Sequence, residues 1–357
     1  MPDQTQTYHA AIVGLTGIGA SAPGRAPDAV LGSSMPHSHA HAYARDPRTS
    51  VVAVCDLLPA LLDKFQDSWK AAFPEARGYT DVHEMLAQER IDLLSVVTSD
   101  HRHAQIVVDA VASGVKGIFC EKPIATTLAD ADRMLAACRE RGVPLLIDHT
   151  RRWYPDFLEA RRLVRAGEIG PLRTVVATLG GPRAMLFRNG THLVDTVCFF
   201  AESDLAWVTG ELDDEHRAYG PRYAGDGGRD PATDPGGSAY LHFENGVRAF
   251  INASKRTMGN FELDLVGERG RIRVGANAGE VWRTLDSGQS ATYRLASPHT
   301  TQSDMSAAID ELIGLIERGG TGSSTGEDGR RTLSILLGIL QSSAAGGAPV
   351  RFPVEDY

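Results

Sequence analysis

A lysine stands between a short apolar run and a proline in the stretch Phe119–Pro123. If residues 115–120 form a parallel strand, Lys122 lies just beyond its carboxyl end, where open α/β sheets bind their ligands. An amine at that place could exchange a proton with a substrate hydroxyl. Two alternatives stay open from this stretch alone: a solvated surface lysine, which is the commoner case, and a structural ion pair with Glu121.

A glycine-rich turn, Gly14–Gly19 (GLTGIG), follows a predicted buried strand at residues 10–14. A dinucleotide-binding fold needs glycines there for a tight turn, for close approach of the backbone to the pyrophosphate, and for helix packing. Gly14 and Gly19 match the G-x-G-x-x-G pattern, whereas Thr16 stands at its middle position and Gly17 is extra. A simple glycine turn is the alternative.

Asp56 closes the second predicted strand, residues 51–55, where a carboxylate can accept hydrogen bonds from an adenosine ribose. It lies farther from Gly14 than the usual interval of about 20 residues, and the stretch 21–36 accounts for the excess. Leu57 and Leu58 follow in place of Arg or Lys, so a ribose 2′-phosphate would meet a carboxylate and no cation. This favours NAD over NADP.

The apolar runs before residue 149 do not alternate, as expected for strands that helices cover on both faces. Strand and helix follow each other repeatedly, which predicts a right-handed parallel sheet of the Rossmann type. We therefore expect an α/β dinucleotide-binding domain at residues 1–149. Its predicted strands are 10–14, 51–55, 93–98, 115–120 and 144–147, and its predicted helices are 58–73, 103–113 and 128–141.

After Asp148 the segments alternate in polarity, and 244–246 and 267–270 have the composition of hairpin turns. We expect a C-terminal α+β domain at 150–357 with a largely antiparallel open sheet, which binds substrate and mediates oligomerisation. Its exposed face needs covering, which predicts a homodimer or homotetramer. Its predicted helices are 155–166, 305–318 and 331–341, and its predicted strands are 173–179, 239–243, 247–253, 261–266 and 271–274; helices within 304–345 could pack back on the first domain.

Two loops interrupt these elements: residues 21–36, rich in Gly, Ala, Pro and Ser, and residues 218–237, a polar stretch rich in Gly, Pro and Asp. Long loops without secondary structure are uncommon in compact domains and are often lids or disordered segments. Their role stays open.

The chain has 357 residues, which suits two domains, with 42% hydrophobic and 23% charged residues. A net charge of −9 argues against nucleic acid or an anionic membrane as a main partner and favours a small molecule. The four cysteines form no C-x-x-C pair, which predicts reduced core thiols. The N-terminus lacks the pattern of a signal peptide and no apolar run reaches about 18 residues, so we expect a cytoplasmic protein.

Several histidines raise the question of a metal. No cysteine or Glu-x-x-His pattern accompanies them, so we expect no metal site. His39 is expected instead to begin the helix after the inserted loop. The histidines concerned are His9, His37, His39, His41 and His101.

In their order and spacing, these motifs resemble the glucose-fructose oxidoreductase / inositol dehydrogenase (Gfo/Idh/MocA) family over nearly the whole chain. The stretches that carry the resemblance are 14–19, 53–56, 98–103, 121–123, 151–155, 190–195 and 325–329.

The resemblance implies a nicotinamide-dependent oxidoreductase that acts on a secondary alcohol of a sugar or cyclitol, with Lys122 and His192 handling the proton. Two alternatives remain: an enzyme that keeps its cofactor bound throughout, and a non-catalytic nicotinamide-sensing protein on the same fold. The implied cofactor-binding residues are Gly14, Thr16, Gly17, Ile18, Gly19, Asp56, Thr98, His103, Glu121 and Lys122. The implied substrate-binding residues are Lys122, Arg152, Arg188, Asn189, His192 and Asp195.

Physical chemistry agrees with these roles. A free lysine has a pKa of about 10.4, which must fall for the amine to act as a base near neutral pH, and burial beside an oxidised nicotinamide would lower it. His192 is expected near the start of a helix, with Thr191 or Asn189 as N-cap, where a neutral imidazole is favoured. A satisfied buried histidine is the alternative. Asp195 either orients His192 or caps a neighbouring loop.

One position departs from the family pattern. Members often carry a carboxylate four residues before the histidine, and this chain has Arg188 there. Either the substrate carries a carboxylate or phosphate, which a guanidinium binds well, or Asn189 takes over the polar contact.

Overall fold

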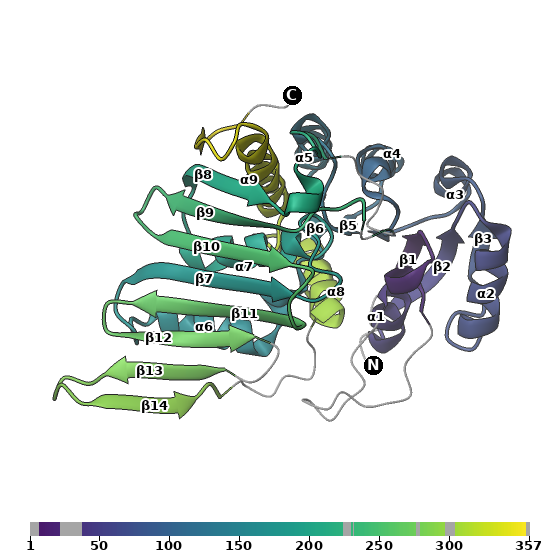
Figure 1. Ribbon diagram of the computed structural model, residues 1–357. Coiled ribbons are helices and arrows are strands. Elements are labelled where there is room, and N and C mark those ends of the chain that lie inside the picture. The colour runs from purple at the N-terminus through teal and green to yellow at the C-terminus, as the bar shows by residue number, and fades with distance from the viewer. Residues whose placement is uncertain are drawn as a thin grey trace. The chain divides into compact units, whose positions relative to one another are not determined.

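The computed structural model describes residues 7–21, 38–223, 230, 232–275, 279–296 and 304–354. The chain forms two compact units (Figure 1): residues 1–125, 129–148 and 301–327 belong to the first, and residues 126–128, 149–300 and 328–357 to the second. Residues 22–36 of the first predicted loop, and residues 224–229 and 231 of the second, lie outside the described residues.

The described strands of the first unit form one parallel sheet in the order β3-β2-β1-β4-β5-β6. This order is that of a doubly wound dinucleotide-binding sheet, with its switch point between β1 and β4, and it confirms the predicted parallel fold. The strands are β1 (Tyr8–Val13), β2 (Thr49–Cys55), β3 (Arg77–Tyr79), β4 (Leu93–Val96), β5 (Gly117–Cys120) and β6 (Leu145–Ile147). The helices are α1 (His39–Arg45), α2 (Pro59–Trp69), α3 (Val82–Gln88), α4 (His103–Ser113), α5 (Leu128–Arg141) and α8 (Asp304–Arg318).

Local chemistry sets these elements. Every residue of β4, β5 and β6 is buried, which explains why their apolar runs do not alternate. The Asp81 carboxylate accepts hydrogen bonds from the backbone N–H groups of His83 and Glu84 and so caps α3. Gly114, with φ of +93°, ends α4 in the left-handed conformation. Because the strands of this sheet run parallel, their carboxyl ends lie at the same edge of the sheet.

The second unit contains a nine-stranded sheet within the described residues, in the order β14-β13-β12-β11-β7-β10-β9-β8-β15. Neighbouring strands run antiparallel except β7 and β10, which are parallel. The two predicted hairpins are present, β9 with β10 and β11 with β12. The strands are β7 (Leu172–Gly180), β8 (Leu205–Leu212), β9 (Gly237–Phe243), β10 (Arg248–Ser254), β11 (Asn260–Gly267), β12 (Gly270–Gly275), β13 (Glu280–Thr284), β14 (Ser290–Arg294) and β15 (Val350–Arg351).

Helices α6 (Pro155–Arg165) and α7 (Gly190–Ala201) pack against this sheet, α6 at β12 and α7 at β7 (Figure 1). The C-terminal helix α9 (Gly326–Ala344) packs against β8, where Gly210 faces Ile339. Strands β9 and β10 alternate between buried and more exposed residues, so one face of each is covered. The last two helices belong to different units: α8 lies in the first unit, and α9 from Asp328 onward lies in the second. None of the helices in the described part of the chain is long and apolar enough to cross a membrane.

Several elements were not predicted. Strand β3 has three residues and α3 seven, which is too short to give a clear period. Gly210 interrupts the apolar pattern of β8, and β14 is largely exposed, so neither strand has a strong hydrophobic signal.

Candidate active site

The glycine turn after β1 has a geometry that side chains would prevent. Gly14 has φ of +96°, and a Cβ atom there would lie 2.3 Å from the backbone oxygen of Val97. A Cβ atom on Gly19 would lie 2.1 Å from the backbone oxygen of Gly14. Gly17, with φ of +50°, has open space around its Cβ position. The turn therefore brings bare backbone to the switch point of the sheet.

Asp56 is fixed beside this turn. Its Oδ2 accepts a hydrogen bond of 2.9 Å from the backbone N–H of Leu15, and its Oδ1 accepts one of 3.0 Å from Leu58. The side chains of Leu57 and Leu58 are exposed. The carboxylate thus stands at the carboxyl end of β2, next to the glycine turn, as predicted from its place in the sequence.

His103 ties together the ends of β4 and β5. Its Nδ1 lies 3.1 Å from the backbone oxygen of Pro123 and its Nε2 lies 3.1 Å from that of Thr98. The ring is fully buried. Two residues predicted to bind the cofactor, Thr98 and His103, are therefore joined to each other and to the turn that carries Lys122.

Lys122 is buried at the carboxyl end of β5, with 5% of its surface exposed. The alternative of a solvated surface lysine is therefore wrong. Its Nζ lies 3.7 Å from Oε2 of Glu121, so the ion pair considered from the sequence is present. Burial of Lys122 favours its neutral amine, whereas the nearby carboxylate of Glu121 favours its ammonium form, so the two effects oppose each other.

A second carboxylate and a histidine lie behind Glu121. Nε2 of His39 is 3.4 Å from Oε1 of Glu121 and 3.8 Å from Oδ2 of Asp148. One ligand atom from each of the three residues lies within 4.8 Å of the others, so in the described part of the chain these side chains form the group that could hold a cation. His39 begins α1, as predicted, whereas its proximity to Asp148 was not predicted.

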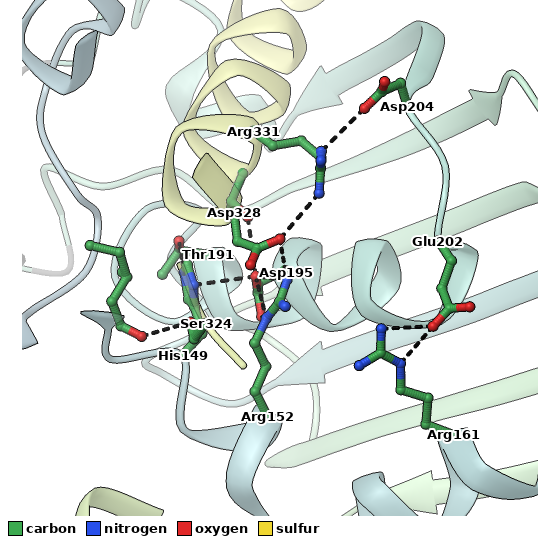
Figure 2. Close-up of polar contacts among 12 residues, drawn as sticks. His149, Arg152, Arg161, Thr191, Asp195, Glu202, Asp204, Ser324, Asp328 and Arg331 are labelled. Atoms are coloured by element: carbon green, nitrogen blue, oxygen red, sulfur yellow. Dashed lines mark hydrogen bonds and ion pairs between the residues drawn. The ribbon is translucent and has the colours of Figure 1, made fainter. Parts of the chain in front are cut away.

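In the second unit, Arg152 and Asp195 form a bidentate ion pair (Figure 2). The Nε–Oδ2 and Nη2–Oδ1 distances are both 2.9 Å, and Nη2 of Arg152 also lies 3.2 Å from Oδ1 of Asp328. Burial alone would lower the pKa of Arg152, but the charge and hydrogen bonds of Asp195 raise it above its ordinary value. These two residues, predicted to bind substrate, neutralise each other in the interior of the unit.

His149 joins the same network, and sequence reasoning missed it. Its Nδ1 lies 3.2 Å from Oδ1 of Asp195, and its Nε2 forms a 3.2 Å hydrogen bond with Oγ1 of Thr191 (Figure 2). The rings of His149 and His192 are 6.0 Å apart, edge to face. Asp195 therefore contacts Arg152 and His149, and His149 in turn packs against His192.

His192 lies in the first turn of α7, as predicted, with 8% of its surface exposed. Asn189 stands at the N-cap position, but its side chain donates a hydrogen bond to the backbone oxygen of Arg183 and caps no helix N–H. The backbone N–H groups of Phe187 and Arg188 donate to the buried carboxylate of Asp234. The structure thus supplies a carboxylate beside residue 188 from a loop 46 residues away, for which the sequence offered no local signal.

Comparison with known families accounts for both units. Residues 29–149 match the oxidoreductase family with an NAD-binding Rossmann fold, GFO_IDH_MocA, and residues 157–273 match the GFO/IDH/MocA C-terminal domain. The chain belongs to the Gfo/Idh/MocA family. This confirms the resemblance inferred from its motifs.

Among Gfo/Idh/MocA relatives, D-apiose dehydrogenase of Paraburkholderia graminis is 27% identical over 329 residues, which cover 87% of this chain and 85% of the relative. Inositol 2-dehydrogenase of Salmonella typhimurium is 31% identical over 121 residues, which cover 34% of this chain and 35% of the relative. The solved WlbA dehydrogenase of Bordetella pertussis, in complex with NADH and UDP-GlcNAcA, is 21% identical with a TM-score of 0.73, covering 98% of this chain and 100% of that one. This last likeness concerns the fold.

The residues of this Gfo/Idh/MocA protein fit its NAD cofactor. The open space at the Cβ position of Gly17 leaves room for the pyrophosphate, and Asp56 offers a carboxylate to a ribose. The residues predicted to bind the cofactor all lie in the first unit.

Proposed function

We propose that the protein oxidises a secondary alcohol of a sugar, sugar derivative or cyclitol with NAD, or reduces the corresponding ketone. The observation that carries the proposal is Lys122, a buried amine at the carboxyl end of β5 in the same unit as the glycine turn and Asp56. Relatives named D-apiose dehydrogenase and inositol 2-dehydrogenase support a polyol substrate.

In the proposed mechanism, Lys122 takes the proton of the reacting hydroxyl, and it returns the proton in the reverse direction. His192, near the positive end of α7, is the second proton-handling group, held in place by His149 and, through it, by Asp195. When bound, the nicotinamide supplies the acceptor for the hydride. Arg188 and Asn189 remain proposed substrate contacts.

A substrate panel tests this proposal. Aldoses, sugar acids, glycosides and cyclitols are each incubated with NAD or NADP, and the appearance of reduced nicotinamide is followed. Oxidation of at least one polyol with NAD supports the proposal. Failure of every compound, together with tight binding of NADH, would instead favour a cofactor-sensing protein.

Asp56 is expected to set the preference for NAD. Replacing it with alanine removes the acceptor for the ribose hydroxyls, so we expect kcat/KM for NAD to fall by about 10-fold or more, the scale of a hydrogen bond to a charged group, and the preference over NADP to narrow. Steady-state kinetics with both cofactors measure this. Asp81→Ala is the matched control, because that carboxylate also accepts two backbone N–H groups but caps α3. An equal loss in the control would contradict the assignment.

We also propose that the open face of the nine-stranded sheet joins a second copy of the chain. Val176 and Phe250 are 38% and 46% exposed on adjacent strands, and Tyr240 packs 5.0 Å from the ring of Phe250 on the next strand. Trp207 and His242 stack 5.4 Å apart on the same sheet. Such an aromatic face is typical of an interface.

The mass in solution tests the interface. We expect a dimer or tetramer by light scattering, and a shift towards monomer in Phe250→Glu, since a charge would be buried without a partner. Met258→Glu is the control, because Met258 is 85% exposed outside the strands. A monomeric wild-type protein would contradict the proposal.

The cytoplasm remains the proposed location. Its support is that Cys55, Cys120, Cys138 and Cys198 are all buried and unpaired, as expected in a reducing compartment.

A further inference from the structure

A chain of hydrogen bonds runs through the interior of the first unit towards Lys122. The hydroxyl of Tyr43 lies 2.9 Å from Oγ of Ser95, which lies 2.9 Å from Nδ1 of His39. Nε2 of His39 continues the chain to Oε1 of Glu121 at 3.4 Å. The other carboxylate oxygen of Glu121, Oε2, is 3.3 Å from the backbone N of Lys122 and 3.7 Å from its Nζ. Glu121 thus divides its two oxygens between His39 and Lys122.

Asp148 adds a second carboxyl group to this chain. Its side chain is 1% exposed, and none of the described residues donates a hydrogen bond to either of its oxygens. It follows β6 directly, and its backbone N–H bonds to the oxygen of Cys120, so it is held next to the end of β5. An ionised carboxylate in this position would be buried without a donor, which is costly.

The charges around Asp148 favour a proton on it. Burial raises the pKa of Asp148 well above its ordinary value, the negative charges of Glu121 and Asp304 raise it further, and Lys122 opposes them. Two carboxyl groups that face each other in a dry interior cannot both ionise. Among the described residues, the titratable groups that face Asp148 are His39 on α1, Cys120, Glu121 and Lys122 at the end of β5, and Asp304 at the start of α8.

A divalent cation is the other way to balance these charges, since one histidine and two carboxylates suit several metals. The Lys122 amine, 3.7 Å from Glu121, can already place a positive charge on that carboxylate and would repel a metal ion there. A proton on Asp148 balances the charges without bringing a second cation close to the Lys122 amine.

We propose that Asp148 is protonated and donates a hydrogen bond to Glu121, and that it thereby acts as a positioning residue for Lys122. This inference rests on the proposed role of Lys122 as the base. With Asp148 neutral, Glu121 is the charged member of this carboxyl pair, and its carboxylate is held in place by His39 on one side and Asp148 on the other. Loss of the donor leaves Glu121 less neutralised, so it holds the ammonium form of Lys122 more strongly.

The pH profiles of two variants test the positioning role. In Asp148→Asn the amide N–H replaces the carboxyl O–H as donor to Glu121, whereas Asp148→Ala has no donor. We expect the acid-side midpoint of the kcat/KM profile to move up by about 1 pH unit in Asp148→Ala, the scale of one hydrogen bond to a charged group, with kcat about 10-fold lower. In Asp148→Asn, the acid-side midpoint and kcat should both stay close to their wild-type values. Equal shifts in the two variants would overturn the proposal.

Thermal unfolding tests the proton itself without any substrate. A carboxyl group whose pKa is raised by folding stabilises the protein fully below its unfolded pKa of about 3.9, and this contribution is lost as pH rises through the folded value. Asp148→Asn has no proton to lose. We therefore expect the melting temperature of Asp148→Asn, relative to that of the wild type, to increase as pH rises from about 5 to about 9. A difference that is constant with pH would overturn the proposal.

Elemental analysis of the purified wild-type protein covers the remaining case. If the wild-type protein contained one equivalent of a divalent metal that Asp148→Asn lacked, the proposal that Asp148 is protonated would be overturned in favour of a metal site. If instead Lys122→Ala retained full turnover, the proposed function would fail, while the pH dependence of unfolding would still decide whether Asp148 carries a proton.

Discussion

Replacing Lys122 with alanine is expected to lower kcat by about 10²–10⁴-fold, the scale for loss of general acid-base catalysis. The reason is that the amine is buried at the carboxyl end of β5, where it can take the hydroxyl proton of a bound polyol. Lys122→Arg should be nearly as inactive, because a guanidinium stays protonated at working pH. NADH binding, followed by fluorescence titration, should change far less than kcat.

Lys116→Ala is the matched control for this experiment. Lys116 directly precedes β5, at the end of the strand opposite to Lys122, and also pairs with a carboxylate, with Nζ 2.8 Å from Oδ1 of Asp92, but its side chain is 38% exposed. We expect its kcat to stay within about 2-fold of wild type, because Lys116 lies at the amino end of β5, away from the carboxyl ends of the strands where the ligand is expected to bind. If Lys122→Ala behaved like Lys116→Ala, Lys122 would be a structural lysine.

Replacing Arg152 with alanine is expected to destabilise the second unit by about 3–5 kcal/mol, because the buried carboxylate of Asp195 would lose the guanidinium that neutralises it. For a unit of this size such a loss lowers the melting temperature by roughly 6–20 °C. Arg152 and Asp195 are joined by two hydrogen bonds of 2.9 Å, and both are almost completely buried. Differential scanning calorimetry of the purified variant measures the shift.

Two further variants sharpen this prediction. Arg217→Ala removes an exposed ion pair with Asp214 in the same unit and should change stability by less than about 1 kcal/mol. The double variant Arg152→Met/Asp195→Leu should recover much of the lost stability, since replacing both partners of a buried pair with apolar residues is often neutral. A small effect of Arg152→Ala alone would show that the pair is not important for folding.

The layout of both sheets could be predicted because two different hydrophobic patterns mark them. Strands β4 and β5 are buried on both faces and do not alternate in polarity, whereas β9 and β10 alternate around an Asn-Gly turn. Strand β8 was missed because Gly210, which lies against Ile339 of α9, breaks its pattern for a reason of packing that the sequence does not display.

The candidate site could be predicted in part. Asp56 and Lys122 follow strands directly, and the carboxyl end of a parallel strand is where a ligand-binding residue is expected. The same rule applies to Asp148, which follows β6 directly. The contacts among His39, Glu121 and Asp148, and those of His149 with Asp195, join residues far apart in the chain, so only the folded structure brings them together.

The most direct measurement is transfer of deuterium from a polyol to the cofactor. The polyol that the panel identifies is labelled at its carbinol carbon, and the reduced cofactor is analysed by mass spectrometry. A dehydrogenase of the proposed kind predicts one deuterium in each NADH formed, with formation slowed by about 10²–10⁴-fold in Lys122→Ala. Reduced cofactor without label, or labelled cofactor formed at the wild-type rate by Lys122→Ala, would contradict the account.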